Sequence, residues 1–210
     1  MSGELKWRLI DQTNRPYHLN ENDKCCYFMD YQSRGAPSVS EANQRISNLK
    51  RSPKYKGQAP WNYKIGAVNI FANNLVSLFG QTQEYTVAFI PSSKKKDDSE
   101  YDERFDLLRN ALAILASNLR IEEPIVTKLS RVATHLSSDR PKPNEIKETY
   151  QWNGFQNQPF ECLYLIDDVI TTGAQFRAYK DLVLEHQPDL KILGVFWAKT
   201  FWPNPSEGMI

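Results

Sequence analysis

Cysteine and histidine are scarce in this sequence, with three residues of each among 210. Cys25 and Cys26 are adjacent and Cys162 lies inside an apolar run, so a framework of disulfide bonds is not expected. The chain also contains no C-x-x-C or H-x-x-x-H spacing, which argues against a structural zinc site. These absences predict a protein of a reducing compartment.

Long apolar runs and an excess of one charge sign are missing as well. No stretch approaches the roughly 20 apolar residues that a membrane-spanning helix needs, and residues 1–8 are too charged for a secretory signal. Lys and Arg number 26 against 25 Asp and Glu, so no overall field favours nucleic acid or an anionic membrane. We therefore expect a soluble cytoplasmic protein without membrane association, and nucleic acid is not indicated as a partner.

Aromatic residues, by contrast, make up 12% of the chain and include five Trp, so large rings must be buried or used at a site. The length suits one domain, or one domain with an elaborate attachment. Residues 1–60 carry no recognisable motif and are rich in loop-forming residues. We predict that they form an N-terminal extension or hood, which could also bind a protein partner, and that residues 61–210 form the core.

Apolar periodicity alternates along the chain between strand and helix spacing. Strands are expected at 24–31, 85–90, 124–129, 162–166 and 191–198, and helices at about 40–50, 61–80, 105–119 and 174–186. The polar segment 131–158 predicts an extended loop. This alternation predicts an α/β fold with a mostly parallel central sheet flanked by helices.

One stretch carries chemistry, the run LYLIDDVITTGA at residues 163–174. A buried strand is expected to deliver Asp167 and Asp168 at its C-terminal end, and a small, hydroxyl-rich bend then leads into a helix. Ligands of open α/β sheets sit beyond such strand ends, and the N–H groups of a helix start suit a phosphate. Carboxylates accept hydrogen bonds from a sugar diol. The combination predicts a site for a ribose 5-phosphate; the alternative is an ordinary turn that caps the next helix.

The same stretch resembles the phosphoribosyl pyrophosphate (PRPP) motif of type I phosphoribosyltransferases, which is a hydrophobic strand, two acids, Thr-Thr-Gly and a small residue. The resemblance implies the type I fold, with Asp167 and Asp168 at the ribose hydroxyls, where they stabilise a cationic transition state. The implied 5-phosphate cradle consists of Thr171, Thr172, Gly173, Ala174 and Gln175. Many members have Thr or Ser where Gln175 stands. Among the branches, the chain is distantly similar to the competence-associated (ComF-like) one, whose N-terminal zinc-binding cysteines it lacks.

The resemblance also implies a pyrophosphate loop after the preceding strand, where Ser92, Ser93 and Lys94 stand. Their hydroxyl, backbone N–H and ammonium groups suit pyrophosphate oxygens; the alternative is a solvated charged loop. Mg²⁺ is the implied cofactor, held through substrate oxygens and water, with the two aspartates as the candidate protein contacts.

Four further residues are candidates with a simpler interpretation beside each. Arg131 and Arg140 lie in the long polar segment and are candidates for a lid that closes over the substrate, or else are surface charges. Phe196 and Trp197 follow the last strand's apolar run and are candidates for stacking on a base, although packing in the core is the simpler interpretation.

The implied activity is transfer of the 5-phosphoribosyl group from PRPP to a nitrogen nucleophile, a nucleobase-like acceptor, by a homodimer. A hypothesis of a different class is a non-catalytic PRPP or nucleotide sensor, or an effector subunit controlled by a protein partner, for example in antiphage defence or competence. An open acceptor pocket would favour catalysis, and a pocket filled by the protein's own side chains would favour the effector.

Overall fold

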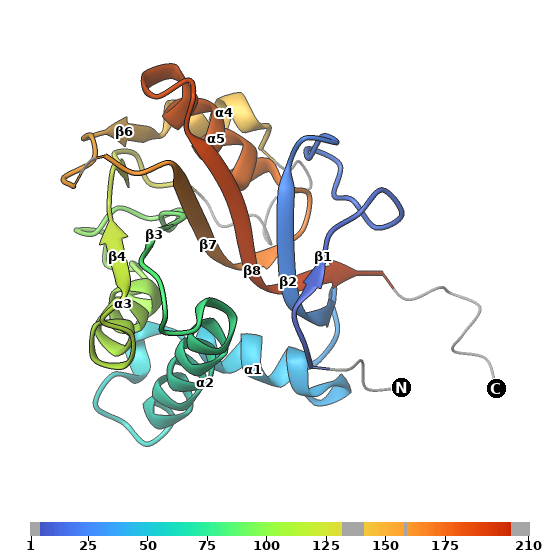
Figure 1. The fold of residues 1–210 in the computed structure, drawn as a ribbon. Coiled ribbons are helices and arrows are strands. Elements are labelled where there is room, and N and C mark those ends of the chain that lie inside the picture. Colours follow the sequence, from blue (N-terminus) through green and yellow to red (C-terminus); the bar gives the residue numbers. More distant parts are fainter. Residues whose placement is uncertain (1–4, 132–140, 158, 203–210) are drawn as a thin grey trace.

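The computed structural model describes residues 5–131, 141–157 and 159–202 of the chain (Figure 1). Its centre is a six-stranded sheet with the order β1-β2-β8-β7-β3-β4. Every neighbouring pair is parallel except β1 with β2. The strands are β1 Arg8–Leu9, β2 Lys24–Gln32, β3 Tyr85–Phe89, β4 Leu119–Glu122, β7 Cys162–Ile170 and β8 Lys191–Phe201. The predicted mostly parallel α/β sheet is therefore confirmed.

Helices cover both faces of this sheet (Figure 1). On one face lie α1 (Glu41–Leu49), α2 (Trp61–Phe79) and α3 (Arg104–Leu115), and on the other lie α4 (Pro143–Glu148) and α5 (Ala174–His186). Short 3-10 turns at Pro37–Val39 and Pro53–Tyr55 lead into and out of α1. The Oγ of Ser40 caps α1 by accepting from the N–H of Asn43, and Gly80 ends α2 with a φ of 64°. Among the described residues no helix is both long and apolar enough to cross a bilayer.

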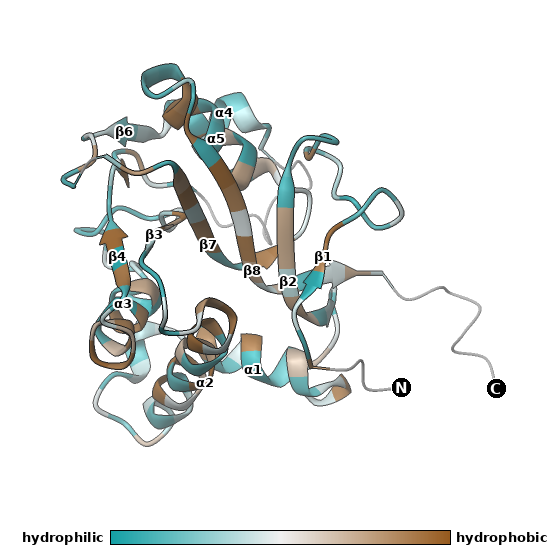
Figure 2. Ribbon diagram, viewed as in Figure 1, coloured by the Kyte–Doolittle hydropathy of each residue, from teal (hydrophilic) through white to brown (hydrophobic). Residues whose placement is uncertain are grey.

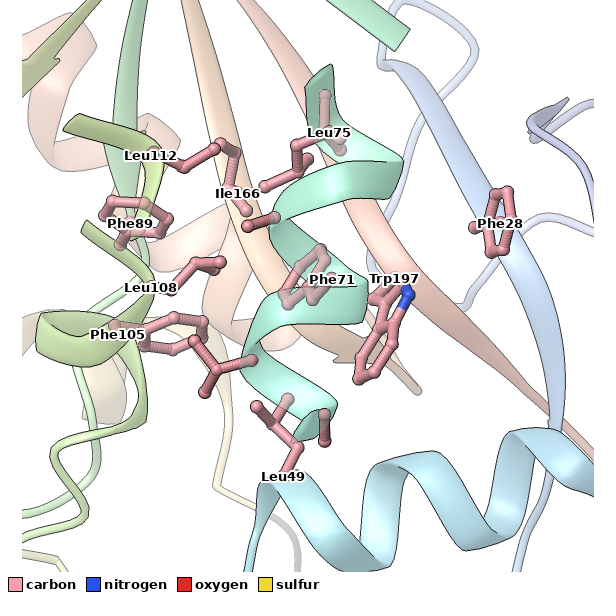
Figure 3. Close-up of a cluster of buried hydrophobic side chains, with 14 of the residues drawn as sticks. Phe28, Leu49, Phe71, Leu75, Phe89, Phe105, Leu108, Leu112, Ile166 and Trp197 are labelled. Carbon is pink, nitrogen blue, oxygen red and sulfur yellow. The ribbon is translucent and has the colours of Figure 1, made fainter. Parts of the chain in front are cut away.

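The core has two parts because the central strands are apolar on both faces (Figure 2). In the part under α2, the rings of Phe71 and Trp197 lie side by side (Figure 3) and stack at 4.7 Å. The Trp197 indole donates to Asn74 Oδ1 at 2.9 Å. Phe196 points to the other part, against Phe176. Both candidate base-stacking residues are thus buried in the core, which corrects that role to packing.

Three of the predicted segments differ from the structure. The helix expected over 105–119 ends at Leu115, because the chain turns extended at Ala116 and Leu119 begins β4. The expected loop 131–158 contains α4 and a strand, β6 (Tyr150–Trp152), which pairs antiparallel with β5 (Ile125–Thr127). The strand expected to end at residue 166 continues to Ile170, because β8 runs on beside it.

The predicted N-terminal extension, residues 1–60, contributes β1 and β2 to the central sheet and α1 to the helical layer. β2 pairs with β8 along its whole length, from Lys24 opposite Leu193 to Gln32 opposite Phe201. The division of the chain at residue 60 stays a prediction.

Candidate functional site

The strand order places a topological switch point between β3 and β7. From β3 the chain crosses through α3 to β4 on one side, and from β7 it crosses through α5 to β8 on the other. The β3–β7 ladder ends near Phe89 opposite Ile166, whereas β7 stays paired with β8 as far as Ile170. Open α/β sheets bind ligands at such a divergence, beyond the carboxyl ends of the strands.

Asp167 and Asp168 lie at this point, inside β7 rather than after it. Since successive strand residues face opposite sides, the two carboxylates diverge, and their exposed fractions are only 5% and 3%. Asp168 lies between two cations, with Oδ1 3.3 Å from Lys50 Nζ and Oδ2 2.8 Å from Arg104 Nε. The N–H of Asp168 donates to Asp167 Oδ1 at 2.8 Å.

These surroundings separate the acidities of the two carboxyl groups. Burial and the neighbouring Asp168 carboxylate raise the pKa of Asp167 to about 8. Burial alone would also raise the pKa of Asp168, but Arg104 and Lys50 outweigh it and hold that pKa below its usual value. Asp167 is therefore the weaker acid of the two and donates a hydrogen bond while it holds its proton, whereas Asp168 is the stronger acid and accepts.

Of the predicted phosphate cradle, Thr171, Thr172 and Gly173 form the bend between β7 and α5, and Ala174 and Gln175 are the first two residues of α5. Gly173 is the N-cap of α5 with a φ of 81°, and Thr172 Oγ1 accepts from the N–H of Ala174 at 3.4 Å. Thr171 and Thr200 hydroxyls meet at 3.0 Å. The strand–bend–helix order predicted from the sequence is confirmed, and α5 presents its N-terminus at the switch point.

A segment far away in the sequence, residues 16–23, packs on this bend. The N–H of His18 donates to the Thr172 carbonyl at 2.8 Å, and Leu19 lies 3.1 Å from the position that a Cβ of Gly173 would take. Asp23 fixes the segment on α5 by ion pairs with Arg177 and with Lys180, the latter at 2.7 Å. The chain thus covers one side of its own bend.

The predicted pyrophosphate loop begins after Ile90 and Pro91, which follow β3, and it contacts Arg131, one of the two lid candidates. The Ser92 carbonyl accepts from Thr127 Oγ1 at 2.5 Å, and the Ser93 carbonyl accepts from the N–H of Arg131 at 2.8 Å. Lys94 Nζ, however, pairs with Glu100 at 2.6 Å. The structure therefore joins Ser92, Ser93 and Arg131, and the Lys94 ammonium is already engaged in an ion pair.

Arg131 also leads to a residue that sequence reasoning missed. Its guanidinium lies 5.9 Å from the ring centroid of Tyr150, which is 3% exposed and within electrostatic range of Asp167. Within the described part of the chain, the Tyr150 hydroxyl and the Nε and Nη2 atoms of Arg131 are buried without a hydrogen-bond partner. Arg140, the other lid candidate, lies outside the described residues.

Beside the loop lies a cavity of about 350 Å³ whose wall includes Pro91, Ser92 and Lys94. The stacked rings of Phe89 and Phe105 also line this cavity, and the two aspartates do not.

The carboxylates do not fit a directly coordinated divalent metal. Both oxygens of Asp168 face cations, burial raises the pKa of Asp167, and the described residues contain no group of three or more potential His, Cys, Asp or Glu ligands. Any Mg²⁺ at this site would have to be held by oxygens of the ligand and water.

Comparison with known proteins gives a partial likeness in shape. No protein-family model and no curated protein sequence matches the chain. It is similar to the structure of a hypoxanthine phosphoribosyltransferase from Staphylococcus aureus, with 11% identity, a TM-score of 0.38 and coverage of 65% of this chain and 74% of that one. It is also similar to the structure of a xanthine-guanine-hypoxanthine phosphoribosyltransferase of Helicobacter pylori, with 10% identity, a TM-score of 0.32 and coverage of 66% of this chain and 87% of that one.

Proposed function

We propose that this chain is a phosphoribosyltransferase that binds PRPP at the carboxyl ends of β3 and β7 and transfers the 5-phosphoribosyl group to a ring nitrogen of a nucleobase-like acceptor. The observation that supports this most is one juxtaposition. The Asp167–Asp168 pair, the bend 171–173 and the start of α5 stand at the topological switch point, and the loop Ser92–Lys94 follows the adjacent strand. The ComF-like resemblance stays a prediction.

In the proposed reaction the bond between the anomeric carbon and the diphosphate oxygen breaks, and the electron pair leaves with pyrophosphate. The nitrogen lone pair forms the new bond, and the nitrogen loses its proton to solvent. Asp168, which is ionised, stabilises the positive charge that develops on the ribose, and Asp167 donates to a ribose hydroxyl. The N–H groups at the start of α5 bind the 5-phosphate.

A second candidate is binding of PRPP or a nucleotide without transfer. Three observations favour it: Asp168 is already paired with Lys50 and Arg104, residues 16–23 cover the bend, and the two proposed base-stacking rings are buried. Such a protein would act as a sensor or as an effector subunit, in the manner of an antiphage or competence component, with a protein partner docking on residues 1–60.

The test is calorimetric titration with PRPP, with and without Mg²⁺, followed by a pyrophosphate-release screen over nucleobases. Binding with release supports the transferase, binding without release on any base supports the sensor, and no binding refutes both. The double variant Asp167→Asn/Asp168→Asn should lose PRPP binding, whereas Asp97→Asn, an exposed carboxylate, should not. An unaffected double variant would remove the diol assignment.

Two further proposals accompany this function. The active species would be a homodimer, and light scattering of the purified protein tests it. Mg²⁺ would enter with the diphosphate of PRPP, so we expect the metal to bind weakly in the absence of PRPP.

A further inference from the structure

The Lys50–Asp168 ion pair is part of a closed ring of polar contacts. Arg104 binds Asp168 through Nε at 2.8 Å and Asp102 through Nη1 at 2.7 Å. Asp102 in turn binds Lys64 Nζ at 2.5 Å. The ring brings together the end of α1, the start of α2, the start of α3 and the strand β7.

Lys64 closes the ring by holding the main chain on both sides of Lys50. Its ammonium donates to the carbonyl of Leu49 at 2.7 Å and to the carbonyl of Arg51 at 3.0 Å. The Lys50 backbone is therefore fixed by the same buried side chain that fixes Asp102. Lys64 is 0% exposed, and burying such a charge costs several kcal/mol before its partners compensate. A hydrophobic contact would hold α1 at a lower cost in free energy. The role of the ring is therefore better explained as positioning Lys50 and Asp168 than as stabilising the fold.

Lys50 is the member of the ring that reaches solvent. Its side chain is 35% exposed, against 16% for Arg104 and 0% for Lys64. The ring contains three basic side chains, Lys50, Lys64 and Arg104, and only two acidic ones, Asp102 and Asp168. An excess positive charge thus remains at the carboxyl end of β7, and Lys50 is the cation that can present it.

We infer that Lys50 is a substrate-contacting residue that binds the diphosphate of PRPP. This inference rests on the proposed function. In PRPP the 2-hydroxyl is on the carbon next to the anomeric carbon that carries the diphosphate. A ribose whose hydroxyls are bound by Asp168 therefore places that diphosphate within one side-chain length of Lys50 Nζ, which lies 3.3 Å from the same carboxylate. The ammonium then exchanges a carboxylate oxygen for a phosphoryl oxygen, and Arg104 keeps Asp168 in position.

Two probes separate this role from a merely structural one. PRPP and ribose 5-phosphate share the sugar and the 5-phosphate, and only PRPP carries the diphosphate. In calorimetric titrations, Lys50→Gln should lower the affinity for PRPP about tenfold or more and leave the affinity for ribose 5-phosphate unchanged. Lys50→Arg should restore most of the PRPP affinity. Lys56→Gln is the matched control, because Lys56 carries the same charge in the same segment but is 63% exposed and pairs with Glu103.

Each other outcome overturns the inference. Equal losses for both ligands in Lys50→Gln would mean that Lys50 only positions Asp168, and unchanged or higher PRPP affinity would mean that it makes no diphosphate contact. A loss of similar size in Lys56→Gln would assign the effect to general charge. If the wild-type protein binds neither ligand, the proposed function fails and this inference fails with it, which distinguishes that case from a failure of Lys50 alone.

Discussion

Replacing Lys64 by Met should be among the most destabilising single changes in this chain. Methionine has a similar length and no donor, so the change removes three hydrogen bonds from a fully buried ammonium, to Leu49, Arg51 and Asp102. Two carbonyls and one carboxylate oxygen would lose a buried partner. Removing one member of a buried ion pair costs about 3–5 kcal/mol, and we expect a decrease of the free energy of unfolding in that range.

Urea denaturation followed by Trp fluorescence measures this decrease, since the probe ring Trp197 lies in the core beside α2. The midpoint temperature of thermal unfolding should fall by roughly 10 °C for a protein of this size. Lys56→Met is the matched control, because an exposed lysine contributes less than about 1 kcal/mol through its ion pair. If Lys64→Met lost no more stability than Lys56→Met, the ring would not be holding α1, and the argument for the placement of Lys50 would fail.

Three other predictions concern the same site. The pKa of Asp167 is raised in the folded protein, so this carboxyl group should lower the free energy of unfolding as pH rises from about 4 to about 8. Asp167→Asn has no such proton to lose, so urea titrations across this range should show its free energy of unfolding rising relative to that of the wild type. A difference that stays constant with pH would contradict the prediction. Gly173→Ala should destabilise the protein more than Gly57→Ala, for which we expect a loss of about 1 kcal/mol, as measured by thermal melts. Both glycines have a φ near 80°, but only a Cβ at residue 173 meets Leu19. Equal losses would argue that Leu19 moves aside freely. Asp23→Asn weakens the ion pairs with α5, so the amide of His18 should exchange faster with deuterium, and an unchanged rate would mean that residues 16–23 are held by other contacts.

Local sequence patterns were sufficient to predict the parts of the site that lie close together in the chain. The acids, the bend and the start of α5 follow one another within twelve residues, and the strand–bend–helix order follows from apolar runs and Gly173. The apolar pattern gave a wrong helix boundary where a helix and the following strand both use leucine. Leu119 continues the helical spacing of α3, yet it is the first buried residue of β4. Periodicity alone does not distinguish these two positions.

Contacts between distant residues were beyond the sequence. Lys50 and Asp168 are more than a hundred residues apart, and neither their pairing nor the part that Arg104 plays in it leaves a local signal. Tyr150 was hidden because a three-residue strand in a polar segment has no clear periodicity. The burial of Phe196 and Trp197 follows from the length of β8, which the pairing with both β7 and β2 determines.

The pairing of β2 with β8 has a consequence for synthesis of the chain. The strand β2 has as its partner β8, which follows it along the chain, with about 170 residues between Lys24 and Leu193. Until β8 emerges, the apolar residues of β2 have no neighbour in the sheet except the two-residue β1. Such long-range parallel pairing slows folding, and an unpaired apolar strand invites aggregation. A nascent chain stalled before β8 should therefore depend strongly on chaperones, and the dependence should disappear once β8 has been translated and released from the exit tunnel.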